Sequence, residues 1–228
     1  IDVMDALGTN VRFDARGREV LRIVPRVNDD VNEEWASDKT RYAVDGLTRR
    51  RLDTPYVRRN GKLEKASWAE AFDAIKGANA GASVAAIAGD LVDCETMFAA
   101  KALVNAMGGS LLEGRQTGMD YDTSSLSAVN FNSTIAGIET SDVILLIGTH
   151  LRWEAPLINT RIRKAVKRGA KVFAIGPEID LTYKVEWLGD DASLAVKLPA
   201  AALDALKGAE RPLIILGGGG LAVPGVHG

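Results

Sequence analysis

From Ser67 onward the sequence alternates short apolar segments with segments of helical pattern. The clearest apolar segment is Val143–Ile147, a continuous run of β-branched residues and leucine that is typical of strands covered on both faces. A helix is expected at Pro156–Lys167 and the next strand at Lys171–Ile175. Successive strand–helix units of this length favour an α/β fold, with a mostly parallel, Rossmann-like sheet and helices on both faces.

Further elements fit the same alternation. Ser67 and Glu70 have the spacing of a capping box, which predicts the start of a helix at Trp68–Lys76. The segment from Gly114 to Thr140 has little regular pattern and is expected to form a loop at the carboxyl edge of the sheet. The remaining expected elements are a strand at Val84–Ala88, a helix at Glu95–Met107, a helix at Ala201–Leu206 and a strand at Pro212–Leu216.

Residues 1–66 differ from the rest of the chain. Short segments with some period-2 character predict small strands at Ile1–Val3, Val11–Phe13 and Val20–Val24. The charged stretch Asn28–Arg51 has little periodicity, and we expect a loop with a short helix around Trp35 and Tyr42. The predicted domains are therefore a small β-rich subdomain at residues 1–66 and an α/β domain at residues 67–228, truncated at its C-terminus.

Composition excludes several classes of function. With 28 basic and 30 acidic residues, the net charge of −2 gives no basic footprint for nucleic acid and no polybasic membrane anchor. The apolar runs are far shorter than the roughly 20 residues of a membrane-spanning helix. The single cysteine, Cys94, can form no internal disulfide and cannot alone hold an iron–sulphur cluster.

The glycine run Gly217–Gly220 is expected to form a tight turn, because it lacks the lysine of a phosphate-binding loop.

Four polar residues near the N-terminus stand in a distinctive frame: Asp2, Asp5, Thr9 and, much later, Ser37. The frame resembles that of molybdopterin oxidoreductases such as formate dehydrogenase, in which all four positions are cysteines that hold a 4Fe-4S cluster. Iron–sulphur clusters select soft thiolates, and Asp, Ser and Thr oxygens do not replace a full set of them. The resemblance therefore marks these residues as vestigial cluster-ligand positions, and we expect no cluster here.

A second match surrounds the strand at Val143–Ile147. The residues after it resemble the family's loop that touches a pterin dinucleotide, but His150 and Leu151 stand where that loop has Asn-Pro. Glu178 has the wrong charge for a phosphate contact. We therefore expect no molybdenum cofactor, no metal and no catalytic residue in this chain, and a structural role for the lysine at position 39. The vestigial pterin-cleft candidates are Lys39, Gly148, Thr149, His150, Arg152, Gly176 and Pro177.

Within the superfamily, the motifs Asn32-Glu-Glu-Trp35 and Arg152-Trp-Glu-Ala-Pro156 are most similar to the large iron–sulphur subunits of NADH:quinone oxidoreductase, respiratory complex I. The resemblance implies a non-catalytic scaffold segment of an oxidoreductase, with 2Fe-2S and 4Fe-4S clusters in a region that precedes these residues. It implies partners among the hydrophilic-arm subunits and the remainder of the same subunit, with no nucleic acid and no membrane insertion. The expected location is peripheral, on the cytoplasmic face of a bacterial inner membrane or the mitochondrial matrix side.

Two alternatives remain open on the sequence. The first is an active molybdopterin-dependent oxidoreductase domain like that of formate dehydrogenase. The second is a nucleotide-binding regulatory module that uses the glycine turn at Gly217–Gly220.

Overall fold

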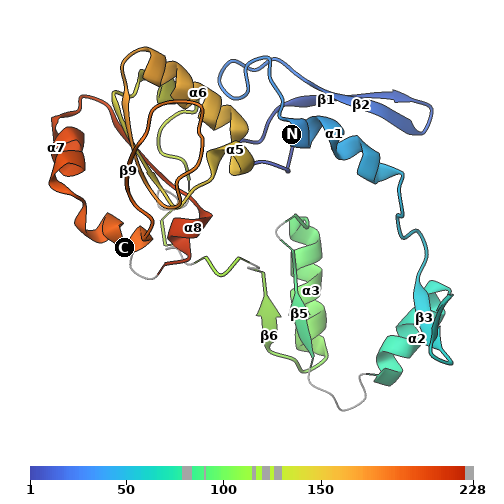
Figure 1. Ribbon diagram of the computed structural model, residues 1–228. Helices are drawn as coiled ribbons and strands as arrows, with labels where there is room; N and C mark the ends of the chain where they lie inside the picture. The colour runs from blue at the N-terminus through green and yellow to red at the C-terminus, as the bar shows by residue number, and fades with distance from the viewer. Residues whose placement is uncertain (79–83, 90, 115–116, 120–123, 126–129, 224–228) are drawn as a thin grey trace. The chain divides into compact units, whose positions relative to one another are not determined.

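The computed structural model describes residues 1–78, 84–89, 91–114, 117–119, 124–125 and 130–223 (Figure 1). The chain divides into two compact units. Residues 1–44 and 117–228 form the sheet unit, and residues 45–116 form the second unit. The predicted boundary between residues 66 and 67 divides the chain at another point and stays a prediction.

A parallel sheet of four strands, in the order β10-β7-β8-β9, is the core of the sheet unit. All five residues of the apolar run Val143–Ile147 are buried in β7, and β8 and β10 pair with it in parallel on either side. The predicted mixed helix–strand architecture with a parallel sheet is therefore confirmed. The strands are β7 (Val143–Ile147), β8 (Lys171–Ile175), β9 (Glu186–Gly189) and β10 (Pro212–Leu216).

Helices cover both faces of this sheet because the side chains of β7 alternate between two hydrophobic clusters (Figure 1). Ile144 packs in the same cluster as Ile162 of α6, whereas Leu145 packs in the cluster that holds Ala202 of α7. The helices of this part are η2 (Ala136–Thr140), α5 (Leu151–Glu154), α6 (Pro156–Lys167), η3 (Ala192–Lys197), α7 (Ala200–Gly208) and α8 (Gly218–Leu221).

The N-terminal part of the sheet unit contains an antiparallel hairpin and a short helix. The strands expected at Val11–Phe13 and Val20–Val24 are confirmed inside longer strands, but the strand expected at Ile1–Val3 is wrong. The chain bends there because the Asp2 side chain accepts a hydrogen bond from the backbone N–H of Met4. The elements are β1 (Val11–Arg16), β2 (Glu19–Pro25), α1 (Asp38–Tyr42) and η1 (Ala43–Leu47), which continues into the second unit.

An ion-pair cluster ties the loop after β2 to α6. The Arg161 side chain is 5% exposed, lies 2.8 Å from Glu139 and donates to the Asp29 carbonyl at 2.6 Å. Lys164 bonds both Glu33 and Glu139. Burial alone would raise the pKa of Glu139, but the hydrogen bonds from Lys164 and Arg161 outweigh it and lower that pKa. Removing either the cations or the carboxylates of this cluster would therefore leave the other charges without compensation.

The second unit is built from short elements with strong local signals. Ser67 and Glu70 form the predicted capping box at the start of α2, with the Ser67 N–H 2.8 Å from the Glu70 carboxylate. A hairpin that was not predicted turns at Asn60-Gly61, both with positive φ, as a two-residue turn between antiparallel strands requires. The elements are β3 (Tyr56–Arg59), β4 (Lys62–Lys65), α2 (Trp68–Ala78), β5 (Ala85–Ile87), α3 (Cys94–Ala106) and β6 (Leu111–Glu113).

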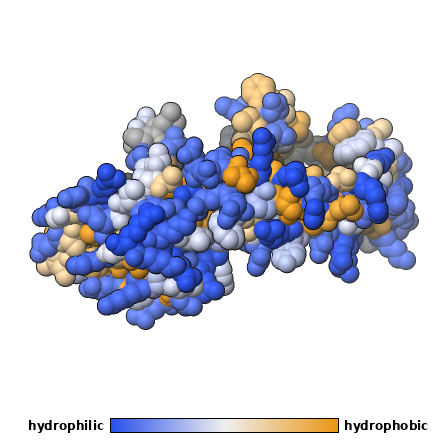
Figure 2. Space-filling model, turned by 90° about the horizontal axis from the view of Figure 1, so that it is seen from above, coloured by the Kyte–Doolittle hydropathy of each residue, from blue (hydrophilic) through white to orange (hydrophobic). Residues whose placement is uncertain are grey.

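No helix in the described part of the chain is long and apolar enough to span a membrane. Hydrophilic residues make up most of the face seen in Figure 2, and hydrophobic residues appear between them in small groups.

Candidate functional site

The four positions predicted to be vestigial cluster ligands lie together, joined by a fifth polar residue. The Thr40 hydroxyl donates to Asp2 at 2.6 Å and lies 3.0 Å from the Ser37 hydroxyl. The Thr9 hydroxyl donates to Asp5 at 3.2 Å. A backbone hydrogen bond of 2.8 Å from Asp2 N–H to the Thr9 carbonyl connects this group of three to the pair of Thr9 and Asp5. These five residues form what we call the polar cluster.

Local structure explains why the polar cluster forms. Ser37 is the N-cap of α1, and its side chain accepts a hydrogen bond from the backbone N–H of Thr40. Thr9, Ser37 and Thr40 are buried, so their hydroxyls need partners, and the partners are one another and the two carboxylates. Thr40 was missed by the sequence analysis, although its spacing of three residues from an N-cap serine was the available signal.

A pocket opens where the strands of the parallel sheet end, and its floor is main chain. Gly148, directly after β7, has a φ of 56°, and a Cβ there would lie 2.1 Å from the backbone nitrogen of Gly220. Hydrogen bonds of 2.9 Å join Gly217 N–H to the Ile147 carbonyl and Gly219 N–H to the Gly148 carbonyl. The expected tight turn at Gly217–Gly220 is wrong in form: Gly218–Leu221 form the short helix α8, and Gly217 is its N-cap. Only glycine permits this close approach.

The cavity has a volume of about 390 Å³ and lies at the carboxyl ends of β7, β8 and β9. It brings together five of the seven predicted pterin-cleft residues, and it adds several that the sequence analysis missed, three of them acidic. The five are Gly148, Thr149, His150, Gly176 and Pro177, and the additional residues are Glu154, Ile179, Asp190, Asp191, Ala192, Gly219 and Val223.

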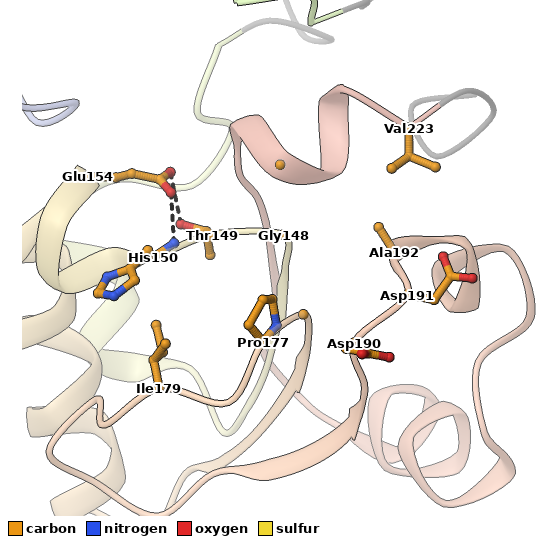
Figure 3. A pocket seen from close by; sticks show the side chains of 12 residues that line it. Gly148, Thr149, His150, Glu154, Pro177, Ile179, Asp190, Asp191, Ala192 and Val223 are labelled. Carbon is orange, nitrogen blue, oxygen red and sulfur yellow. Dashed lines mark hydrogen bonds between the residues drawn. The ribbon is translucent and has the colours of Figure 1, made fainter.

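One side of the pocket is organised by Glu154 (Figure 3). Its carboxylate accepts hydrogen bonds from the His150 backbone N–H at 2.7 Å and from the Thr149 hydroxyl at 3.1 Å. The His150 ring stacks on Trp153 with ring centroids 4.3 Å apart. Its Nδ1 is buried and has no hydrogen-bond partner within the described residues. The stacked ring thus presents one polar atom that the surrounding chain does not satisfy.

The other side of the pocket carries Asp190 and Asp191, which follow β9 (Figure 3). The backbone N–H of Ser193 donates to Asp191 at 2.9 Å, and this hydrogen bond lowers the pKa of the Asp191 carboxyl. No lysine or arginine lines the pocket among the residues that the structure describes. The lining is therefore acidic, and it would repel the anionic phosphates of a dinucleotide.

Lys39 and Arg152 do not line this pocket. The Lys39 ammonium donates to the backbone carbonyl of Trp153, which fastens α1 to the end of α5. Arg152 donates to the Asp180 carbonyl at 2.9 Å and pairs with the Asp180 carboxylate at 3.3 Å. Both basic groups are thus used for contacts within the chain.

The pocket wall at Ile179 continues into a segment that α6 holds in place. Buried Asn159 donates to the Leu181 carbonyl at 3.1 Å and accepts a hydrogen bond of 2.7 Å from the Tyr183 hydroxyl. Burial of Tyr183 raises the pKa of its phenol, so that the hydroxyl stays a donor. Thr182, between these anchors, has a φ of 71°, which is unusual for a β-branched residue. The wall is therefore fixed by contacts from outside the segment.

Two family models match the sequence. The model for molybdopterin oxidoreductases matches residues 51–224. The model for the NADH-ubiquinone oxidoreductase NDSU1/NuoG-like 4Fe-4S domain matches residues 1–45.

Relatives with similar sequences carry concordant names. A subunit of the NADH-quinone oxidoreductase of Rickettsia felis is 45% identical over 96% of this chain and 34% of its own length. The NADH-ubiquinone oxidoreductase 78 kDa subunit of Candida albicans is 44% identical over 96% of this chain and 32% of its own length. NADH dehydrogenase [ubiquinone] iron-sulfur protein 1 of Solanum tuberosum is 42% identical over 96% of this chain and 31% of its own length. The chain thus spans about a third of the length of the relatives it matches.

Proposed function

Because the chain belongs to the molybdopterin oxidoreductase family, in the branch of the NADH-quinone oxidoreductase large subunits, we propose that it is a non-catalytic scaffold segment of such a subunit. In this proposal its parent enzyme passes electrons from NADH to quinone through clusters carried outside these residues. In this proposal the sheet unit is a Rossmann-like layer. The placement of α6 and α7 on the two faces of the parallel sheet supports this reading.

The polar cluster is the observation that carries the proposal. Residues 1–45 match a 4Fe-4S domain but contain no cysteine, and the chain's one cysteine, Cys94, lies in the second unit. The oxygen atoms of Asp2, Thr40 and Ser37 bond one another instead of facing an empty space. Since these donors are hard oxygens already engaged, they do not fit an iron–sulphur cluster. We propose that hydrogen bonds now hold the segment that a cluster holds in cysteine-bearing relatives.

The acidic pocket supports the second part of the proposal, the absence of a pterin cofactor. A pterin dinucleotide needs cationic or N–H donors for its phosphates, and the described lining offers Glu154, Asp190 and Asp191. Lys39 and Arg152, the basic candidates, are bonded to backbone carbonyls elsewhere. The residues present therefore do not fit the cofactor, and no reaction step is assigned to it.

The proposed partners follow from the relatives' names and lengths. We propose that the chain packs against the remainder of its own subunit and against other subunits of the hydrophilic arm, and that it is peripheral to the membrane. The corresponding location is the cytoplasmic face of a bacterial inner membrane or the matrix side of a mitochondrial one.

Metal analysis of the 228-residue chain, purified anaerobically without the rest of its subunit, tests the proposal. We expect iron, molybdenum and tungsten at trace levels, no visible absorption of an iron–sulphur chromophore, and no pterin fluorescence after acid release. Stoichiometric iron with an electron paramagnetic resonance signal would contradict the role of the polar cluster. Molybdenum or tungsten with released pterin would instead establish the formate dehydrogenase-like alternative.

The nucleotide-binding alternative finds little support in the glycine turn. The N–H groups of Gly219, Gly220 and Leu221 all donate to backbone carbonyls of Gly148 or Gly217, so these amides do not point at a phosphate. Calorimetric titration with NADH and with ATP should accordingly give no heat of binding.

A further inference from the structure

The start of the second unit is strongly basic in a chain of net charge −2. Between residues 49 and 65 there are seven lysines and arginines and only two acidic residues, Asp53 and Glu64. All the basic residues in this range are exposed. The charge is therefore gathered locally, and its position relative to the β3–β4 hairpin decides what it can contact.

Strand register divides the hairpin into two faces. Residues directly opposite in an antiparallel pair point to the same side, and the pairs are Tyr56 with Lys65 and Arg58 with Leu63. These four residues form what we call the hairpin face. Val57, Arg59, Lys62 and Glu64 form the opposite side.

The opposite side is already used within the unit. Arg59 pairs with Glu70 of α2 at 2.7 Å and lies 3.9 Å from Glu64. The hairpin face has no such partner: neither Arg58 nor Lys65 forms a salt bridge within the described residues. One side of the hairpin is thus neutralised by α2, and the other presents uncompensated cations.

The hairpin face also has the composition and rigidity of a docking surface. Tyr56 is 40% exposed and Leu63 is 61% exposed, and the register sets each of them directly opposite one of the two cations. Tyrosine and arginine are enriched in protein interfaces. The Arg58 guanidinium is held by a 2.7 Å hydrogen bond to the Gly61 carbonyl in the turn, which reduces the entropy that it would lose on binding.

We propose that the hairpin face docks on an acidic surface of a neighbouring protein subunit, with Arg58 and Lys65 facing carboxylates and with Tyr56 and Leu63 covered between them. The proposal rests on the proposed function, since it requires an assembly. A protein partner fits better than nucleic acid, because exposed Leu63 and Tyr56 favour an apolar contact beside the two cations. Complementary charge of this kind guides association and rejects wrong partners.

Carbodiimide cross-linking of the assembled NADH:quinone oxidoreductase tests the contact directly. The reagent condenses a lysine amine with a neighbouring carboxylate into an amide, with the oxygen leaving on the spent reagent as a urea. We expect a cross-linked peptide that joins Lys65 to an Asp or Glu of another subunit, and slower acetylation of Lys65 in the assembly than in the free subunit. Equal acetylation in both states, without such a peptide, would overturn the proposal.

Charge reversal provides the second test, in cells that express the tagged full-length subunit. The double variant Arg58→Glu with Lys65→Glu should lower the fraction of subunit that co-purifies with the oxidoreductase by about tenfold or more. The matched control is Arg163→Glu with Lys167→Glu, which reverses two exposed charges on α6 that form no salt bridge within the described residues. Thermal melting of both purified variants should match the wild type, because all four side chains are exposed.

The outcomes separate this proposal from the proposed function. If the wild type co-purifies with the oxidoreductase and both double variants do so equally, the docking proposal fails while the proposed function stands. If the wild type itself is absent from the oxidoreductase, both fail. Binding of the wild type to anionic lipid vesicles or to duplex DNA that disappears in the Arg58→Glu, Lys65→Glu variant would also overturn the assignment of an acidic protein partner.

Discussion

The two units of this chain owe their structure to different forces. In the sheet unit every residue of β7 is buried between two helical layers. In the second unit Val104 is the only buried hydrophobic residue among those described, whereas Phe98 is 76% exposed and Trp68 is 66% exposed. The sheet unit is thus stabilised by packing, and the second unit by caps, turns and short pairings. We expect substitutions to cost stability in the first unit and to cost little in the second.

The largest loss of stability is expected from Arg161→Ala. It leaves the half-buried Glu139 beside fewer cations and removes the donor of the Asp29 and Val31 carbonyls, which should cost about 3–5 kcal/mol of unfolding free energy. Urea denaturation followed by far-ultraviolet circular dichroism measures it. Arg163→Ala, an exposed neighbour on the same helix, should change stability by at most about 0.5 kcal/mol. Equal effects of the two substitutions would refute the buried role of Arg161.

A pair of large-to-small substitutions, one in each unit, compares the two units directly. Ile144→Ala removes a fully buried side chain and should cost about 2–5 kcal/mol. Phe98→Ala removes a larger but mostly exposed side chain and should cost at most about 0.5 kcal/mol in the isolated protein. Equilibrium unfolding of both variants under one set of conditions gives the difference. If Phe98→Ala is as costly as Ile144→Ala, the contrast between the units is wrong.

Ser67→Ala tests whether local signals hold the second unit. Loss of the capping hydroxyl of α2 should cost about 1 kcal/mol. Because the effect is local, hydrogen exchange should quicken in the backbone amides of α2 and stay unchanged in β7. Ser67→Thr keeps a hydroxyl and serves as the control. Protection of the α2 amides that is unaltered in Ser67→Ala would show that tertiary contacts, not the cap, hold this helix.

The smallest expected effect is a pH dependence of the ion-pair cluster. Interactions with Lys164 and Arg161 lower the pKa of Glu139 although partial burial would raise it. The stabilisation of the folded state by Glu139 is therefore complete above the ordinary pKa of a glutamate and is lost as pH falls through the lowered pKa. Burial would lower the pKa of Lys164, but Glu33 and Glu139 raise it. The stabilisation of the folded state by Lys164 is therefore complete below the ordinary pKa of a lysine and is lost as pH rises through the raised pKa.

Subtracting the stability of Lys164→Met from that of the wild type at each pH isolates this effect. The difference should be level at neutral pH and should shrink at both extremes. Solvent screens Lys164, whose side chain is 35% exposed, so the difference should remain below the effect of Arg161→Ala. A difference that grows toward acid pH would contradict the assignment of Glu139 as its partner.

Sequence predicted the parts of the fold that carry their own periodicity. Val143–Ile147, Pro156–Lys167 and Lys171–Ile175 form elements with the predicted bounds, because a continuous apolar run and a proline at the start of a helix are local signals. β9 has neither signal, and it exists because β8 offers it an edge to pair with. Asp190, which follows β9, was therefore not expected in the pocket.

The sequence likewise indicated some residues of the candidate site and not others. The frame of Asp2, Asp5, Thr9 and Ser37 located the polar cluster, and the ends of β7 and β8 located the pocket. The acidity of the lining was not foreseen, since it arises from residues far apart in the sequence. The hairpin at Asn60-Gly61 was missed although its turn is a strong local signal, since no element was predicted between Arg51 and Ser67.

The backbone contact beneath the pocket limits how this cleft can change by mutation. Any side chain added at Gly148 or Gly217 would push the loop after β7 away from the start of α8, so these two positions cannot be changed to suit a new ligand. A new ligand specificity would have to come from the side chains that line the pocket around these glycines, which we call the rim, such as His150, Glu154 and Asp190. An engineer who wished to give the cleft a new specificity would keep the glycines and exchange the rim.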